Sequence, residues 1–123
     1  MQQHPFFDHA APILSVPDVP TAVTYYRDRM GFTVQFEWEE PATYAVLSAG
    51  PQIQIHLSQA EPGKIPPAGL AMYVFVKEID ALYAQLQEKG VEIMTPIGDR
   101  DYNMRDFDVE DPFGYRWTFG KGH

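Results

Sequence analysis

The chain has 123 residues, no cysteine and a formal net charge of −8 from 9 basic and 17 acidic residues. This length suits one globular domain, the missing cysteine excludes disulfides, zinc–thiolate sites and cysteine nucleophiles, and the acidic charge argues against a nucleic-acid partner. No apolar run reaches the roughly 20 residues of a membrane helix, and the N-terminal region lacks a signal-peptide pattern, so we expect no membrane partner and a soluble, cytoplasmic protein.

The first segment, residues 1–11, is an apolar arm that ends at Pro12. Proline has no backbone N–H and breaks one ladder bond of a strand, so the arm is expected to leave its own module there. An arm that carries Phe6 and Phe7 would otherwise be an exposed apolar tail, which favours docking onto a partner.

A strand, a capped helix and further strands are predicted next. Residues 13–16 are an apolar run, Asp18 is a helix N-cap candidate, and Gly31 is a left-handed helix stop. Between them an apolar stripe recurs at helical spacing, formed by Ala22, Val23, Tyr26 and Met30. Two Gly/Pro-marked strand candidates follow at 43–50 and 51–58.

The chain then repeats this pattern about sixty positions later. Residues 61–69 are rich in proline and glycine and are predicted to be a connector. In the second copy Val76 repeats Val16, Gly90 repeats Gly31, and strand candidates follow at 104–111 and 113–120. A helical stripe lies between them, formed by Ile79, Leu82, Tyr83 and Leu86. The prediction is one α+β domain of two tandem βαβββ modules, residues 1–60 with the arm and residues 70–123, whose uncovered sheet faces curve around a cavity.

Three stretches resemble the vicinal-oxygen-chelate superfamily: VPDVPTAVTYYRDRMGF, LAMYVFVKEIDALYAQL and YNMRDFDVEDPFGYRWTF. This superfamily includes glyoxalase I, extradiol dioxygenases, fosfomycin-resistance enzymes and bleomycin-resistance proteins, and the order and spacing here are most similar to the bleomycin-resistance branch. The resemblance implies duplicated βαβββ modules with curved mixed sheets. It also implies a homodimer that exchanges N-terminal arms, with ligand clefts at the interface.

The same resemblance implies where a metal would be held. The superfamily's four ligand positions fall on Ala11, His56, Ala71 and Thr118. Only His56 is a good ligand, whereas zinc and similar ions need three or four N, O or S donors. We therefore predict no metal, no cofactor and no catalytic residue.

Strand alternation extends the concave face from those positions to neighbouring side chains. The predicted ligand-binding residues are Phe36, Trp38, Gln54, His56, Tyr73, Phe75, Tyr102 and Thr118. Several alternatives remain open. Phe36 is equally well explained as core, Trp38 is favoured as a partly exposed stacking residue, and His56 is either a hydrogen-bonded structural residue or a ligand contact.

Other polar and aromatic residues are assigned structural roles. Trp117 alternates with Thr118 and is predicted to be core. Arg105 is expected to form a salt bridge with one of three aspartates, Asp99, Asp101 or Asp106. The acidic residues of 99–111 are interpreted mainly as a solvated face.

The favoured function is metal-independent binding and sequestration of a planar, antibiotic-like small molecule, with a cationic one favoured by the acidic charge. The alternative is a metal-dependent lyase or dioxygenase of the same superfamily that uses His56. A third possibility is a dimerisation or regulatory domain with a closed cavity.

Overall fold

The computed structural model describes residues 5–64 and 71–122, and the side chain of Ala71 is outside that description. The chain forms two compact units, residues 1–62 and 63–123, and each is described by itself. Part of the predicted arm (1–4) and most of the predicted connector (65–69) lie outside the described residues. Neither described helix is long and apolar enough to span a membrane.

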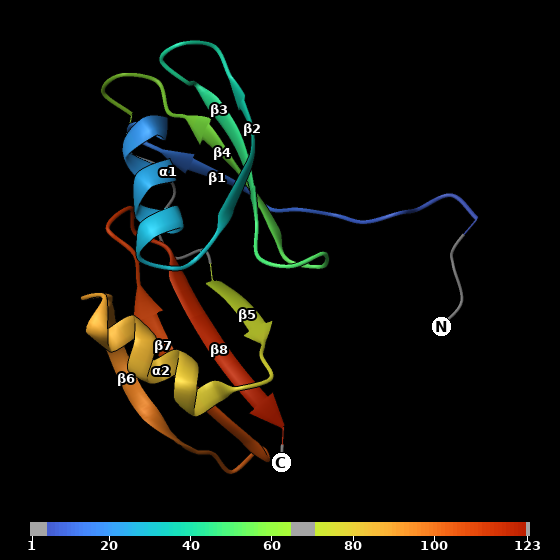
Figure 1. Ribbon diagram of the computed structural model, residues 1–123, viewed down its shortest axis with the longest axis vertical. Helices are drawn as coiled ribbons and strands as arrows, with labels where there is room; N and C mark the ends of the chain where they lie inside the picture. The colour runs from blue at the N-terminus through green and yellow to red at the C-terminus, as the bar shows by residue number, and fades with distance from the viewer. Residues whose placement is uncertain (1–4, 65–70, 123) are drawn as a thin grey trace. The chain divides into compact units, whose positions relative to one another are not determined.

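The N-terminal unit contains one helix and four strands (Figure 1). In chain order they are β1 (Ile13–Val16), α1 (Val19–Asp28), β2 (Thr33–Trp38), β3 (Tyr44–Ser48) and β4 (Gln54–Gln59). The strands lie in the order β1-β4-β3-β2, with β1 and β4 parallel and the other neighbours antiparallel. The chain therefore crosses from β1 through α1 to the far edge of the sheet and returns strand by strand.

The C-terminal unit repeats this arrangement. Its elements are β5 (Ala71–Phe75), α2 (Ile79–Glu88), β6 (Glu92–Asp99), β7 (Met104–Glu110) and β8 (Arg116–Gly122). The order is β5-β8-β7-β6, again with one parallel pair, β5 and β8. The predicted α+β class and the two tandem βαβββ modules are confirmed, and neither sheet closes on itself.

Helix α1 begins and ends where the sequence signals predict. The Asp18 side chain accepts a hydrogen bond of 3.0 Å from the backbone N–H of Thr21, which satisfies one of the free amides of the first turn. Past the end of the helix Gly31 adopts φ 81°, a left-handed conformation that glycine takes without a Cβ penalty. Helix α2 ends before Gly90 in the same way, but Glu78 at its N-cap makes no side-chain capping bond.

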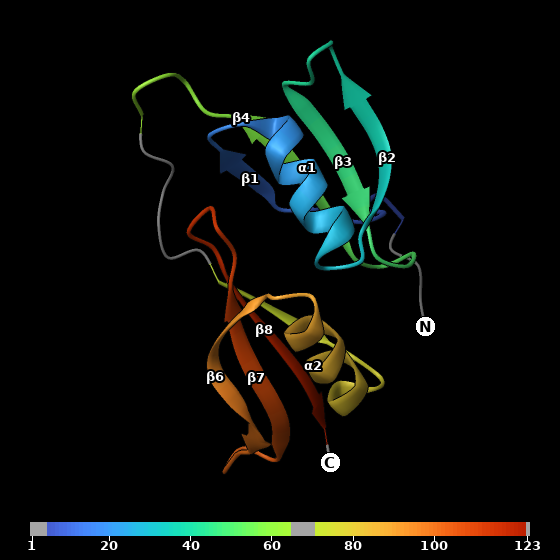
Figure 2. The same cartoon turned by 60° about the vertical axis from the view of Figure 1, so that its left-hand side comes forward.

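Each helix covers one face of its own sheet, as Figure 2 shows. In the N-terminal unit the covered face carries fully buried aliphatic residues that alternate along the strands: Leu14, Val16, Ala45, Leu47, Ile55 and Leu57. In the C-terminal unit Phe107, Val109 and Trp117 occupy the equivalent positions and are fully buried. The prediction that Trp117 is core is confirmed, and its indole N–H donates to the buried carboxylate of Asp111 at 3.0 Å.

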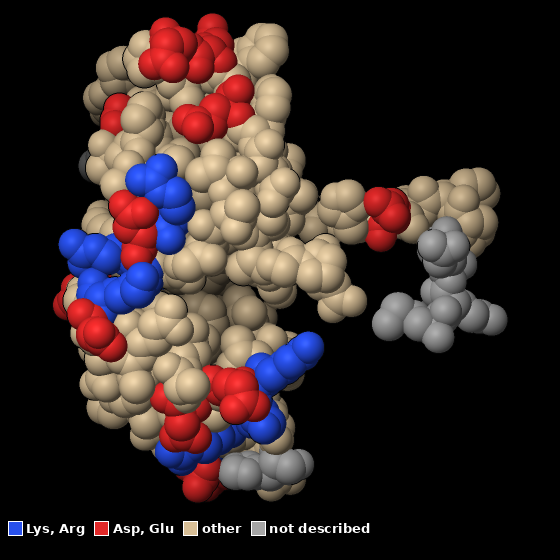
Figure 3. Space-filling view, viewed as in Figure 1, with Lys and Arg blue, Asp and Glu red and all other residues tan. Residues whose placement is uncertain are grey.

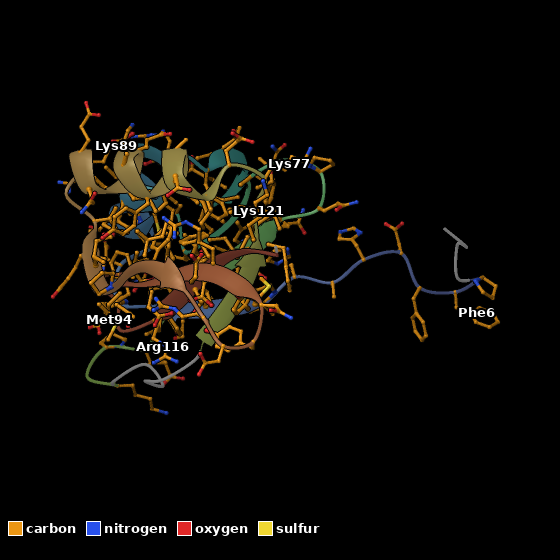
Figure 4. All side chains as sticks on the ribbon, turned by 90° about the horizontal axis from the view of Figure 1, so that it is seen from below. Phe6, Lys77, Lys89, Met94, Arg116 and Lys121 are labelled. Atoms are coloured by element: carbon orange, nitrogen blue, oxygen red, sulfur yellow. The ribbon has the colours of Figure 1, made fainter. Side chains whose placement is uncertain are left out.

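The described part of the N-terminal arm, residues 5–12, contains neither helix nor strand. It joins the sheet at Pro12, whose carbonyl accepts a 2.9 Å bond from the backbone N–H of His56. Both phenylalanines of the arm are exposed, and Phe6 is labelled in Figure 4. The strand thus begins immediately after the proline, as its missing N–H predicts.

Candidate functional site

Each sheet leaves the face opposite its helix uncovered, and we call these the N-terminal and the C-terminal open face. Side chains alternate between the two faces of a strand, so the register determines which residues belong to each. The N-terminal open face carries Ile13, Phe36, Trp38, Tyr44, Val46, Gln54 and His56. The C-terminal open face carries Tyr73, Phe75, Asp106, Asp108, Thr118 and Gly120, and Tyr102 reaches it from the β6–β7 turn.

Two exposed aromatic residues lie on the edge strand of the N-terminal open face. Phe36 is 50% exposed and Trp38 is 59% exposed, and their ring centroids lie 6.4 Å apart. The core alternative for Phe36 is therefore wrong, and the prediction that Trp38 is partly exposed is confirmed. Figure 3 shows acidic side chains around the β2–β3 turn, where Glu39 and Glu40 follow Trp38 directly. A cation near these rings would meet both negative charge and aromatic faces.

His56 lies in the middle of the N-terminal open face, on β4. Its Nδ1 is 2.6 Å from the Tyr44 hydroxyl, and its Nε2 is 3.4 Å from Oε1 of Gln54. Because the amide oxygen of Gln54 can only accept, Nε2 is the donor in that contact, whereas the Tyr44 hydroxyl can either donate to Nδ1 or accept from it. His56 is thus a hydrogen-bonded residue of the sheet, and its contact with a ligand remains a prediction.

Gln54 also borders a hollow at one end of this face. The hollow has a volume of about 500 Å³ and is lined by Thr33, Gln35, Ser48, Gly50, Pro51 and Gln54. Its walls are mainly amide and hydroxyl groups, and Gln35 Nε2 donates to Ser48 Oγ at 2.8 Å. The N-terminal open face thus changes along its strands from polar at this end to aromatic at Trp38.

The C-terminal open face has aromatic side chains on β5. Tyr73 is 41% exposed and Phe75 is more so, and their ring centroids are 5.0 Å apart. Beside them, the Thr118 hydroxyl donates to Oδ1 of Asp108, which is half-buried. The C-terminal open face therefore combines exposed rings on β5 with a carboxylate on β7.

A buried carboxylate, Asp106, lies next to these rings. Its Oδ1 accepts from Arg100 Nε at 2.7 Å, and its Oδ2 accepts from the hydroxyls of Tyr73 at 2.9 Å and of Tyr102 at 2.7 Å. Burial alone would raise the pKa of Asp106, but the hydrogen bonds from Arg100, Tyr102 and Tyr73 outweigh it and hold this pKa below its ordinary value. Burial, together with the hydrogen bond to Asp106 and its charge, raises the pKa of Tyr73 to about 12.

The structure contradicts one sequence expectation about the acidic segment and confirms another. Asp106 is only 3% exposed, so the solvated-face interpretation is wrong for this residue. Its partner is Arg100, whereas Arg105 pairs with Asp80 of α2 at 2.7 Å and with Asp99 at 3.3 Å. The expected salt bridge of Arg105 is therefore confirmed with Asp99. Side-chain alternation puts Arg105 on the helix-covered face, opposite to Asp106, which explains why these two residues do not pair.

A second hollow, of about 290 Å³, lies at the start of α2 and is lined by Lys77, Asp80, Arg105 and Lys121 among others. Lys77 and Lys121 are labelled near one end of this helix in Figure 4. It lies on the helix side of the sheet, and it includes none of the predicted binding residues. Because it lies on the helix side, this hollow does not extend the open face, and Arg105 is paired with Asp80 there.

The residues at the four metal positions do not suit a metal. Ala11 and Ala71 have no donor atom, the Thr118 hydroxyl is bonded to Asp108, and both ring nitrogens of His56 have side-chain partners. Within residues 5–64 and 71–122, no three His, Cys, Asp or Glu side chains are grouped so that they could hold an ion. These residues offer fewer donors than the three or four that such ions require.

Comparison with known proteins identifies the family. A sequence model of the Glyoxalase/Bleomycin resistance protein/Dioxygenase superfamily matches residues 6–119. The chain belongs to this superfamily. A search of curated proteins finds no match to the chain.

Several solved structures share the fold. TioX from Micromonospora sp. ML1 superimposes with a TM-score of 0.81 at 22% identity, covering 95% of this chain and 100% of its own. A glyoxalase/bleomycin resistance protein/dioxygenase from Nocardioides gives 0.74 at 20% identity, with 94% and 84% covered. The bleomycin-binding protein of Streptomyces verticillus, solved with copper(II)-bleomycin, gives 0.74 at 28% identity, with 95% and 98% covered.

The eight predicted binding residues divide into two sets. Phe36, Trp38, Gln54 and His56 share the N-terminal open face, and Tyr73, Phe75, Tyr102 and Thr118 belong to the C-terminal one. Sequence reasoning missed Tyr44, Arg100, Asp106 and Gly120. Alternation along β3 could have indicated Tyr44, but nothing local indicates that Arg100 and two tyrosines converge on Asp106.

Proposed function

We propose that the protein binds and sequesters a planar, cationic, antibiotic-like small molecule without a metal and without changing it chemically. The observation that carries this proposal is that both uncovered sheet faces present exposed aromatic side chains beside polar groups. A sheet face meant only for water would alternate polar residues there. Small-molecule sites, by contrast, combine aromatic walls with a few hydrogen-bonding groups.

The charge distribution supports a cationic ligand. The net charge is −8, acidic residues follow Trp38 on the β2–β3 turn, and Asp108 lies beside Thr118, which pairs with Tyr73 on its other side. A ring system that carries positive charge gains from stacking and from the negative potential, by about 0.5–2 kcal/mol for each well-placed aromatic. A neutral planar molecule would gain only the stacking.

Family relatives indicate the first ligand to try. The bleomycin-binding protein of Streptomyces verticillus is 28% identical and was solved with copper(II)-bleomycin. That ligand belongs to that protein, but a planar aromatic system with a cationic group is the chemistry that the two open faces suit. Bleomycin, with and without copper, is therefore the natural first probe, beside a cationic acridine.

The decisive experiment follows tryptophan fluorescence while each probe is added. The chain has two tryptophans, of which Trp38 is exposed and Trp117 is buried. Ligand stacking on Trp38 is expected to quench its emission, and Trp38→Ala is expected to weaken the affinity by roughly 1 kcal/mol or more. Affinities are best compared by calorimetry, because the variant loses the reporter.

The matched control is Trp38→Phe, which keeps an aromatic ring at the same position and is expected to retain most of the affinity. Association is also expected to slow with salt, because the Debye length falls from about 30 Å at 0.01 M to about 8 Å at physiological ionic strength. Absence of binding to every cationic probe would sink the proposal. Probe turnover by protein that contains stoichiometric metal would instead indicate the lyase or dioxygenase alternative.

A further inference from the structure

Asp106 is an unusual residue for a sheet face because its carboxylate is buried and both of its oxygens accept hydrogen bonds from side chains. Oδ1 is paired with Arg100, Oδ2 accepts from two tyrosine hydroxyls, and Arg100 Nη2 donates to the carbonyls of Asp106 at 3.0 Å and Pro96 at 2.7 Å. Burying an ion pair costs desolvation energy that a packed apolar residue avoids, so such a pair is weak evidence of a role in stability alone. A role of the cluster toward its neighbouring side chains is therefore expected.

The cluster holds two aromatic rings by their hydroxyl groups and leaves the rings accessible. Tyr73 comes from β5 and Tyr102 from the β6–β7 turn, yet both hydroxyls meet the same carboxylate oxygen. Tyr73 remains 41% exposed and Tyr102 61% exposed. A tyrosine anchored at its hydroxyl loses its rotational freedom before a ligand arrives, which lowers the entropy cost of stacking.

Gly120 makes the reach of Tyr73 possible. Asp106 pairs with Gly120 across β7 and β8, and Phe75 pairs with Gly120 across β5 and β8. A Cβ atom at position 120 would lie 2.8 Å from Tyr73 Cζ and closer still to its hydroxyl oxygen. The Tyr73 side chain therefore crosses β8 directly above this glycine. Glycine at this position therefore permits the close approach of the Tyr73 ring to the backbone of β8.

We propose that Asp106 is a positioning residue: it fixes the rings of Tyr73 and Tyr102 as a preformed stacking surface for a planar ligand, and Gly120 supplies the space for this arrangement. This inference rests on the proposed function. Phe75 extends the surface, since its ring centroid lies 5.0 Å from that of Tyr73. The charge of Asp106 is matched by Arg100, so Asp108 supplies the negative charge for a ligand cation.

Three variants separate this role from direct contact. Asp106→Asn removes the charge that organises the cluster, Gly120→Ala displaces Tyr73, and Tyr73→Phe removes one oxygen but keeps the ring. Each is expected to weaken binding of copper(II)-bleomycin or a cationic acridine about tenfold, the cost of ordering one or two side chains on binding. Glu88→Gln, at an exposed residue of α2 on the helix side of the sheet, is the charge-matched control and is expected to bind as the unmodified protein does.

A ligand-free readout accompanies the titrations. In protein with 13C-labelled tyrosine rings, Asp106→Asn is expected to shift the signals of both Tyr73 and Tyr102, whereas Glu88→Gln is expected to shift neither. If Asp106 and Arg100 only stabilised the sheet, Asp106→Asn would shift the tyrosine signals without lowering the affinity for the ligand. Tyr73→Phe is a mild change, and it therefore provides the test if Asp106→Asn fails to fold.

The outcomes are distinguishable. If the unmodified protein binds a probe and Asp106→Asn and Tyr73→Phe bind it equally well, the positioning role is overturned and the proposed function stands. If the unmodified protein binds neither probe, the proposed function and the positioning role are both overturned. Tenfold losses in the three variants, with both tyrosine signals moved in Asp106→Asn, support the inference.

Discussion

At the scale of single residues, Asp106 should make the protein sensitive to acid. Its folded-state pKa lies below the ordinary value of 3.8, so the carboxylate contributes stability that is complete above that value and is lost as the pH falls through the folded pKa. The free energy of unfolding should therefore differ most between the unmodified protein and Asp106→Asn near pH 7. Urea denaturation should show this difference shrinking below about pH 4.

The same titration has a simple control. Glu110→Gln removes an exposed carboxylate from β7, and its effect on stability is expected to be small at every pH. A difference for Asp106→Asn that is equally large at pH 3 and pH 7 would show that the ionised carboxylate is not the form that the fold stabilises.

Single residues also show where sequence reasoning succeeds and where it stops. Strand alternation placed Trp117 in the core correctly, because burial on a covered face depends only on parity. The same alternation put Asp106 on the uncovered face, where an acidic residue is expected to meet water. Its carboxylate is bonded to Tyr73, 33 residues away, and the Tyr73 ring crosses Gly120, which has no side chain to signal its role. Such tertiary convergence leaves no local pattern.

At the scale of elements, the duplicated helices allow an internal comparison of capping. Asp18 caps α1 through Thr21, whereas Glu78 at the equivalent position of α2 makes no side-chain capping bond. Asp18→Ala is expected to lower the free energy of unfolding by about 1 kcal/mol, because it leaves a first-turn amide without a partner. Glu78→Ala is the matched control and should change stability little, as measured by chemical denaturation. Equal losses in both variants would contradict the capping argument.

The order of elements was predictable for a related reason. Val16 ends β1, Val76 directly follows β5, and Gly31 and Gly90 follow the helices with φ 81° and 78°. Each signal is local, since a strand end or a left-handed glycine is determined by a few neighbouring residues. Which faces remain uncovered follows from the helix stripe and strand parity. The polar contacts on those faces do not, because they join strands and turns that are distant in sequence.

At the scale of the whole molecule, removal of metal ions should have no effect. Ala11 and Ala71 occupy two of the four positions from which the superfamily's enzymes hold a metal, so we expect no ion to stabilise the native state. Prolonged treatment with EDTA should leave the melting temperature unchanged. A drop of several degrees that one divalent metal reverses would contradict this expectation and favour the enzyme alternative.

The oligomeric state gives a second whole-molecule prediction. We propose a homodimer held partly by exchange of the N-terminal arms, because Phe6 and Phe7 are exposed on an arm that leaves the sheet at Pro12. Deleting residues 1–11 should shift the protein toward monomer or aggregate in light scattering. Replacing both phenylalanines with serine keeps the arm's length and should act in the same direction.

A clean, stable dimer after that deletion would show that the arm does not hold the subunits together. A full-length protein that scatters as a monomer would remove the proposal altogether. Ligand binding at the aromatic residues of the two open faces is tested separately, by the Trp38 and Asp106 variants.

The matching strand order of the two units has an evolutionary consequence. At equivalent places in the two sheets, Tyr44 pairs with Ser58 in one and Asp106 pairs with Gly120 in the other. The buried residues of each sheet must stay apolar because they pack against a helix. The residues of the uncovered faces are not restricted in this way. Each unit can therefore accept substitutions on its open face that leave the other unit unchanged. A chain built this way can acquire new ligands one half at a time.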